Sequence, residues 1–193
     1  MTDRRGHITA YLDTLRNLLS EISIEQIDDV LEVFERAYRD DRTIFICGNG
    51  GSASTASHWV CDFSKGTVAA KGKRMRMICL GDNLPMLTAY ANDVNYESVF
   101  AEPVRTYVRP HDVVVLLTAS GNSPNVLEAA KAAREVGATT IGLIGFGGGK
   151  LAELVDHQVT VNCREYGPVE DLHLILDHIV SLHMRQVVAN SAR

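Results

Sequence analysis

The sequence has no apolar run long enough to cross a membrane, and its first residues, MTDRRGHITAY, lack the apolar segment of a signal peptide. It also lacks any pair of cysteines at CxxC spacing, because the four cysteines are scattered at Cys47, Cys61, Cys79 and Cys163. These absences favour a cytoplasmic protein with reduced, buried thiols, with no disulfide framework and no membrane partner.

An excess of positive charge is also absent. The 19 Lys and Arg residues stand against 24 Asp and Glu, which gives a formal net charge of −5 at pH 7. This balance disfavours binding to nucleic acid through the overall field of the protein. Long linkers, low-complexity tracts and repeats of fixed period are missing too. A chain of 193 residues can bury a sizeable core, so we expect one domain over 1–193 with an N-terminal helical segment at 1–40.

Five short apolar runs rich in β-branched residues predict buried strands. These runs are TIFIC (43–47), MRMICL (75–80), VVVLL (113–117), TTIGLIG (139–145) and QVTVN (158–162). Helical patterns lie between and around them, twice within 8–38 and then at roughly 53–64, 85–91, 98–108, 124–136 and 168–189. Near-continuous apolarity is typical of parallel strands that are covered on both faces. The alternation predicts an α/β fold with a doubly wound five-stranded parallel sheet flanked by helices.

Two of these strands run into loops of Gly, Asn, Ser and Thr that open a helix. The first loop is GNGGS (48–52) and the second is TASGNS (118–123). Glycines allow a ligand close to the backbone, and free N–H groups at a helix start favour an anion. Neither loop matches GxxxxGK[ST] or GxGxxG, so a phosphate ester is a better candidate than a nucleotide. Each loop alone is equally consistent with a plain turn in which Ser52 or Ser123 caps the helix.

Four titratable side chains lie on two of the predicted helices at helical spacing: His58, Asp62, Glu170 and His178. Two imidazoles and two carboxylates suit a tetrahedral metal site, with zinc as first choice. A general acid–base pair is the alternative. His173 and Asp177 have the same i,i+4 relationship as His58 and Asp62, so spacing alone does not select the pair on the last helix.

The chain resembles the sugar isomerase (SIS) domain family, and within it the phosphoheptose isomerases. The resemblance is carried by CGNGGS (47–52), ANDVNY (91–96), SGNSPNV (120–126) and EDLHLILDH (170–178), which fall in family order. It implies an aldose–ketose isomerase of heptose biosynthesis that converts sedoheptulose 7-phosphate to D-glycero-D-manno-heptose 7-phosphate through an enediol. It also implies a homotetramer with active sites at the subunit interfaces.

The resemblance further implies a set of site residues. One zinc ion per subunit would be held by His58, Asp62, Glu170 and His178, and Asp62 and His178 would transfer protons. The implied substrate contacts are Asn49, Gly50, Gly51, Ser52, Asp62, Asn92, Asp93, Thr118, Ala119, Ser120, Ser123 and Glu170.

Three of these positions depart from the family pattern. Asp62 stands where a glutamate is usual, Glu170 where a glutamine is usual, and Ala119 where a hydroxyl residue is usual. Two other functions therefore stay open, a non-catalytic SIS protein that binds a replication initiator and another phosphosugar enzyme of the same domain family. The ionisable Asp62 and His178 favour an enzyme.

Overall fold

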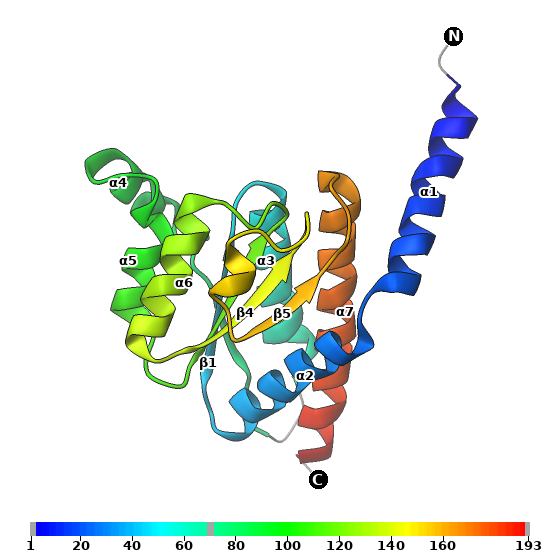
Figure 1. Cartoon of the computed structure of the whole chain (residues 1–193). Coiled ribbons are helices and arrows are strands. Elements are labelled where there is room, and N and C mark those ends of the chain that lie inside the picture. The colour runs from blue at the N-terminus through cyan, green and yellow to red at the C-terminus, as the bar shows by residue number, and fades with distance from the viewer. Residues whose placement is uncertain (1–2, 69–71, 192–193) are drawn as a thin grey trace.

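A central parallel sheet lies between two layers of helices in the computed structural model, which describes residues 3–68 and 72–191 (Figure 1). Within these residues the sheet has five strands in the order β2-β1-β3-β4-β5. The strands are β1 (Thr43–Gly48), β2 (Arg76–Cys79), β3 (Val113–Thr118), β4 (Thr139–Ile144) and β5 (His157–Thr160). The predicted α/β class with a doubly wound five-stranded parallel sheet is confirmed.

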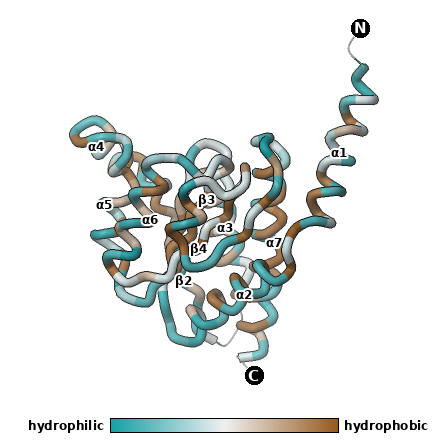
Figure 2. Tube along the Cα trace, viewed as in Figure 1, coloured by the Kyte–Doolittle hydropathy of each residue, from teal (hydrophilic) through white to brown (hydrophobic). Residues whose placement is uncertain are grey.

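Helices cover both faces of the sheet, and the inner strands β1, β3 and β4 are buried along nearly their whole length, as predicted. The predicted burial is wrong for the edge strands, because alternate residues of β2 are exposed and most of β5 is only partly buried. One core lies under α2 (Ile24–Arg39), α3 (Gly51–Cys61) and α7 (Tyr166–Ser191). The opposite core lies under α5 (Ser98–Tyr107) and α6 (Pro124–Val136), preceded by α4 (Leu84–Asp93). A π-helical turn, η1 (Asp62–Gly66), extends α3, and a short 3₁₀ turn, η2 (Leu151–Glu153), follows β4. Figure 2 shows the apolar residues gathered along the central strands.

The direction of winding reverses between β1 and β3. From β1 the chain moves outward to β2, and it then returns to β3 and continues to β4 and β5 on the other side. In such sheets the loops at the carboxyl ends diverge at the reversal and leave a crevice for a ligand. The two loops predicted to bind an anion follow β1 and β3, so they border this crevice.

The ends of α6 are those expected from the sequence. Ser123 stands at the N-cap, Pro124 takes the first helical position, and Gly137 closes the helix in the left-handed conformation with φ 82° and ψ 29°. The start of α3 differs, because Gly50 is the N-cap residue and Ser52 lies inside the helix. The predicted capping role of Ser52 is wrong, since Gly50 turns the chain earlier with a φ of 55° that an L-residue rarely adopts.

The first helix, α1 (Arg4–Glu21), extends away from the body of the molecule (Figure 1). It is attached near its C-terminal end, where Leu18 is buried, and the Tyr11 hydroxyl donates a hydrogen bond of 2.7 Å to Asp171 of α7. Three large apolar side chains on α1, those of Ile8, Leu12 and Leu19, remain exposed. This helix therefore presents apolar surface that the described chain does not cover.

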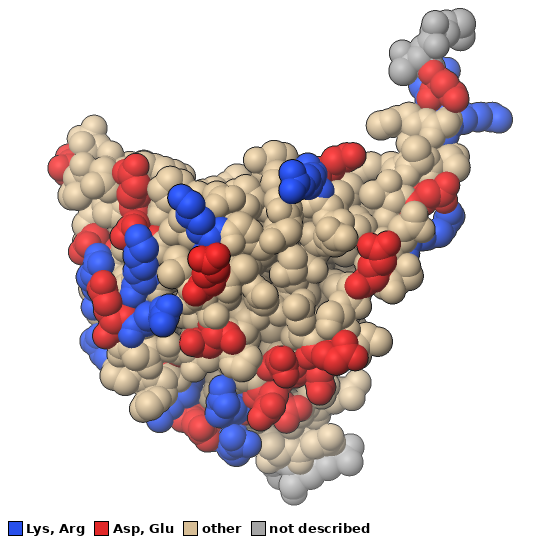
Figure 3. Space-filling view, viewed as in Figure 1, with Lys and Arg blue, Asp and Glu red and all other residues tan. Residues whose placement is uncertain are grey.

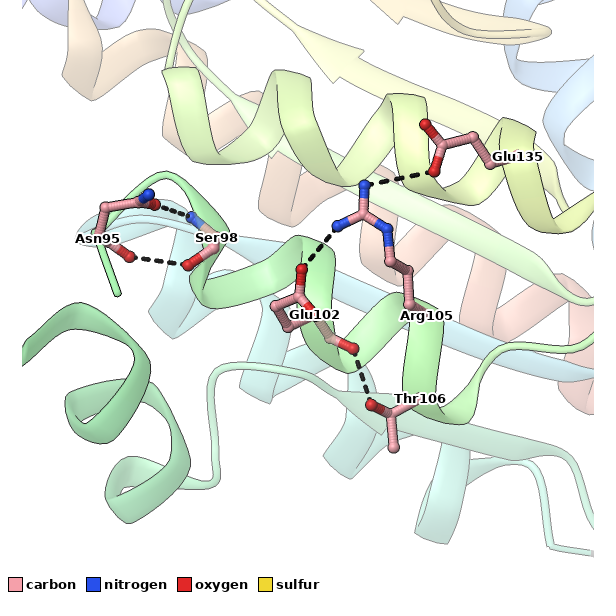
Figure 4. A network of polar contacts seen from close by, with 6 residues as sticks. All are labelled: Asn95, Ser98, Glu102, Arg105, Thr106 and Glu135. Atoms are coloured by element: carbon pink, nitrogen blue, oxygen red, sulfur yellow. Dashed lines mark hydrogen bonds and ion pairs between the residues drawn. The ribbon is translucent and has the colours of Figure 1, made fainter. Parts of the chain in front are cut away.

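Charged side chains on the outer helices are mixed in sign. Arg105 of α5 donates to Glu102 at 2.7 Å and to Glu135 of α6 at 3.3 Å, and thereby links the two helices (Figure 4). In Figure 3 acidic and basic residues intermingle over α5 and α6, whereas acidic residues gather over α2. Exposed pairs of this kind contribute little to stability, typically about 0–1 kcal/mol. None of the helices in the described part of the chain combines the length and apolarity that a bilayer span requires.

The cysteines are only partly as predicted. Cys47 and Cys79 are buried, and burial raises the pKa of both thiols. Cys61 is exposed, because it lies on the outer side of α3, and Cys163 is partly exposed. The expected burial is therefore wrong for Cys61.

Candidate active site

A small polar cavity of about 90 Å³ lies between the loops after β1 and β3. Its lining comes from both loops and from the start of α7: Asn49, Ser52, Leu117, Thr118, Ala119, Ser120, Ser123, Tyr166 and Glu170. The structure thus brings seven of the predicted substrate contacts to one place. Tyr166 was not predicted, because its approach depends on the position of α7.

Three hydroxyl groups converge at this cavity. The Thr118 hydroxyl lies 3.3 Å from that of Ser123 and 3.5 Å from that of Ser120. Within the described structure the Ser123 side chain makes no capping hydrogen bond to α6, although the residue occupies the capping position. The hydroxyls are therefore available to an anion that also faces the N-terminus of α6.

The side chain of Asn49 is held in place beside the hydroxyls. Asn49 and the buried Asn125 exchange two amide hydrogen bonds of 2.8 Å each, and Tyr96 donates to the Asn49 carbonyl at 3.0 Å. Tyr96 and Asn125 fall within the motifs ANDVNY (91–96) and SGNSPNV (120–126), but neither was among the predicted site residues, because their role depends on contacts with the Asn49 side chain. Both fix the orientation of an amide that lines the cavity.

The predicted contacts Asn92 and Asp93 do not line the cavity. They are exposed at the end of α4, where the Asn92 amide donates to Asp93 at 2.8 Å. From this segment Tyr96 reaches the site, where its hydroxyl donates to the Asn49 side chain.

A second glycine-rich segment, residues 145–150, packs against the loop at 118–123. Because this loop carries the Thr118, Ser120 and Ser123 hydroxyls, it is called the hydroxyl loop below. Gly121 has a φ of 66°, and a Cβ at this position would overlap the carbonyl oxygen of Gly148. The loop is tied to this segment by hydrogen bonds from the Leu151 N–H to the Gly121 carbonyl, 3.0 Å, and from the Lys150 N–H to the Asn122 side chain, 3.2 Å. Sequence reasoning overlooked residues 145–150, although their run of glycines was a visible signal.

Glu170 lies on the first turns of α7 and reaches the start of α3. A Cβ on Gly51 would overlap the Glu170 carboxylate, so the carboxylate sits directly over the N-terminus of α3. A negative charge is favourable there because of the unpaired N–H groups and the helix dipole. Glu170 thus lies at the cavity, and a contact between Glu170 and the substrate was predicted from the sequence.

A group of titratable side chains lies further along α3 and α7. His58, Asp62, Asp177 and His178 each offer one ligand atom, and these atoms lie within 4.8 Å of one another. The Asp62 carboxylate is 3.7 Å from His58 Nε2 and 3.8 Å from His178 Nε2, too far for hydrogen bonds. Ligands of a tetrahedral zinc ion lie about 3.3–3.6 Å apart, given the usual bond lengths. Three of the four predicted ligands are therefore together, and Glu170 is outside this group.

Asp177 is the member of the group that the sequence did not select. Its side chain is 0% exposed, and neither carboxylate oxygen has a hydrogen-bond partner among the described residues. Burial, with a further contribution from the charge of Asp62, raises the pKa of Asp177 to about 7. Since a buried carboxylate without a partner is costly, a divalent cation would stabilise this arrangement, and the donor set fits one.

An aromatic cluster fixes α3 against the sheet. The rings of Trp59 and Phe63 stack with an interplanar angle of 1° and centroids 5.6 Å apart, and Phe34 of α2 contacts both. Trp59 and Phe63 flank the site residues along the chain, so their burial directs His58 and Asp62 toward α7. The π-helical turn begins at Asp62, which is typical of functional positions in helices.

Comparison with known proteins places the chain in a family. Residues 10–145 match the family model described as SIS domain. The chain belongs to the SIS domain family. It is 37% identical over 151 residues to a phosphoheptose isomerase of Mycobacterium bovis (strain BCG / Pasteur 1173P2), covering 78% of this chain and 76% of that protein. The corresponding values for the phosphoheptose isomerase of Geotalea daltonii are 34% over 176 residues and 91% of each chain.

Solved structures agree with this SIS assignment. The phosphoheptose isomerase from Neisseria gonorrhoeae matches with a TM-score of 0.88 at 29% identity, over 94% of this chain and 98% of that one. A phosphoheptose isomerase from Francisella tularensis shares the fold with a TM-score of 0.88 at 22% identity, over 96% of this chain and all of that one (100%). The family predicted from the four sequence motifs is confirmed.

Proposed function

We propose that this SIS domain protein is a phosphoheptose isomerase that interconverts sedoheptulose 7-phosphate and D-glycero-D-manno-heptose 7-phosphate. The observation that carries the proposal is the 3.8 Å approach of Asp62 to His178, on a helix whose first turns line the hydroxyl cavity. Relatives at 34–37% identity that are named phosphoheptose isomerases support it.

The spacing along α7 suits a long phosphosugar. Glu170 lines the cavity and His178 belongs to the titratable group, and their separation of eight positions corresponds to about 12 Å of helix. An extended sugar phosphate spans such a distance with its phosphate at Thr118, Ser120 and Ser123 and its carbonyl end beside Asp62. Binding energy at the phosphate end then positions the reacting carbons.

Asp62 and His178 carry the proton transfers in this proposal. A proton leaves C1 of the ketose and the carbonyl oxygen at C2 gains one, which gives the enediol. A proton then returns to C2 while the oxygen on C1 loses one, which gives the aldose. Asp62 is one methylene shorter than the usual glutamate, yet its carboxylate stays within 3.7–3.8 Å of both imidazoles, so the shorter side chain does not separate it from its partners.

We also propose one zinc ion per chain. His58, Asp62 and His178 would hold it together with a fourth ligand from α7, for which the sequence offers Glu170. When bound, zinc supplies a Lewis acid that polarises sugar oxygens near the reacting carbons.

The proposed active form is a homotetramer with the site at subunit interfaces. Two observations support this assembly: the exposed apolar side chains of α1, and the open site, where the His58 and His178 side chains are 47% and 50% exposed. We treat 1–193 as one SIS domain, since α7, beyond the matched residues, packs into the same core as α2 and α3.

Replacing the proton-transfer carboxylate tests the proposed function. Asp62→Asn should lower kcat on sedoheptulose 7-phosphate by about 10²–10⁴-fold, the range for loss of a general acid or base. Asp28→Asn, an exposed change on α2, is the matched control and should leave kcat unchanged. Full activity of Asp62→Asn would overturn the assignment. A wild-type protein that binds the phosphosugar but never converts it would favour the non-catalytic alternative.

A further inference from the structure

We propose that Asp177, and not Glu170, supplies the second carboxylate ligand of the metal ion. This inference rests on the proposed function only for the presence of an ion at the group formed by His58, Asp62, Asp177 and His178. The spacing of the sequence did not single out Asp177. It lies four residues after His173 and directly before His178, so spacing gave it no unique partner.

The position of Asp177 is that of a ligand. Its side chain is fully buried, and its Oδ2 lies 3.9 Å from His58 Nε2 and within 4.8 Å of the ligand atoms of Asp62 and His178. Such separations leave room for an ion at the centre and are too long for direct hydrogen bonds. Two imidazoles and two carboxylates then complete a four-coordinate set.

The lack of other partners points the same way. Neither oxygen of Asp177 accepts a hydrogen bond from any described residue, although buried polar atoms in proteins almost always do. Among the described residues no Lys or Arg pairs with Asp177, and the imidazole nearest to it in an ion-pair geometry is that of His58, with its Nε2 3.9 Å from Oδ2. A cation at this place gives the carboxylate the partner that the protein does not provide.

Glu170 is engaged elsewhere. Its carboxylate lies over Gly51 at the start of α3 and lines the hydroxyl cavity, whereas His58 is seven residues further along α3, or about 10 Å. At this position Glu170 can accept hydrogen bonds from sugar hydroxyls. Glu170 and Asp177, both on α7, therefore serve the two opposite ends of the site.

Zinc binding by matched variants tests whether Asp177 holds the metal ion and Glu170 does not. Wild type, Asp177→Asn, Asp177→Leu and Glu170→Gln are stripped with a chelator, titrated with Zn²⁺ alone, and analysed for bound metal and for the midpoint of thermal unfolding. Both Asp177 variants should bind zinc at least about tenfold more weakly and lose most of the zinc-dependent rise in the midpoint. Glu170→Gln should keep the zinc affinity of wild type within about threefold and instead raise KM for the sugar phosphate.

The metal-free proteins provide a second readout. Without zinc, Asp177→Asn should be at least as stable as wild type, because an unpaired buried carboxylate has been removed. Loss of zinc by Glu170→Gln with retention by Asp177→Asn would overturn the proposal. So would a metal-free Asp177→Asn that fails to fold, because Asp177 would then hold the fold rather than an ion. Zinc bound through Asp177 in a protein that isomerises nothing would refute the proposed function and leave this site standing.

Discussion

At the scale of single residues, the hydroxyl loop is the part of the site whose contribution is easiest to measure. Ser120→Ala and Ser123→Ala should each raise KM for the sugar phosphate by a few-fold to about a hundredfold, since a hydrogen bond to a charged group contributes about 1–3 kcal/mol. Steady-state kinetics measure this, with Ser20→Ala on the exposed face of α1 as the control. Unchanged KM values in both variants would place the phosphate elsewhere.

His173 gives the unfolding free energy a pH dependence. Its imidazole is fully buried, and burial lowers its pKa to about 4 from the usual 6.5. As the pH falls below 6.5, the unfolded chain binds a proton here that the folded protein refuses until about pH 4. The wild-type free energy of unfolding should therefore fall by up to about 3 kcal/mol over this window, relative to His173→Leu.

The comparison between the two proteins isolates this histidine. Asp177, one turn away on α7, is present in both, so its titration affects both curves alike. Urea unfolding of the metal-free proteins between pH 4 and 7 supplies the measurement, as in a standard linkage experiment. If the free energies of unfolding of wild type and His173→Leu changed with pH in parallel, the prediction would be wrong. The imidazole would then take up a proton in the folded state as readily as in the unfolded chain.

Individual site residues differ in how far the sequence could indicate them. His58 and Asp62 have helical spacing and follow a glycine loop, so local pattern and family order agree on them. Asp177 has no such mark, because its importance comes from burial and from the approach of α3, which only the packed structure supplies. Asn125 is similar, since it acts on Asn49, 76 positions away along the chain.

At the scale of elements, the glycine segment behind the hydroxyl loop is a sensitive support. Gly121→Ala places a Cβ against Gly148 in a backbone conformation with φ 66°, so the loop must move. We expect a loss of about 1–3 kcal/mol in stability and an increase of at least about tenfold in KM. Gly66→Ala is the control, because it has no positive φ and no described atom within 4 Å of its Cβ.

Thermal unfolding and kinetics on the two alanine variants measure this difference. Equal stability and KM for Gly121→Ala and wild type would mean that the hydroxyl loop does not depend on the segment at 145–150. A loss confined to stability would mean that the segment supports the fold without shaping the phosphate site.

The elements themselves were predicted well where local pattern decides them. Strands that are buried on both faces carry apolar runs, and α6 begins and ends at Pro124 and Gly137 as expected. The start of α3 was misplaced because Gly50 uses a conformation that no periodicity reveals. The last helix starts at Tyr166, two residues before the predicted boundary, since Pro168 is tolerated in a first turn.

At the scale of the whole molecule, the exposed side of α1 predicts assembly. Light scattering at micromolar concentration should give four times the chain mass of 21.2 kDa. Replacing both Ile8 and Leu12 by Gln should lower this mass, because these exposed side chains would lie in the contact. A wild-type mass of a single chain would contradict the proposed tetramer.

Conversion of the seven-carbon substrate tests the central claim most directly. Sedoheptulose 7-phosphate labelled with ¹³C at C1 is incubated with the wild-type protein and followed by NMR, while calorimetry on the same sample confirms that the sugar phosphate binds. The account predicts that the C1 hydroxymethyl signal declines and that the anomeric signal of D-glycero-D-manno-heptose 7-phosphate appears, with Asp62→Asn far slower. An unchanged spectrum from a wild-type protein that binds the sugar phosphate would contradict it.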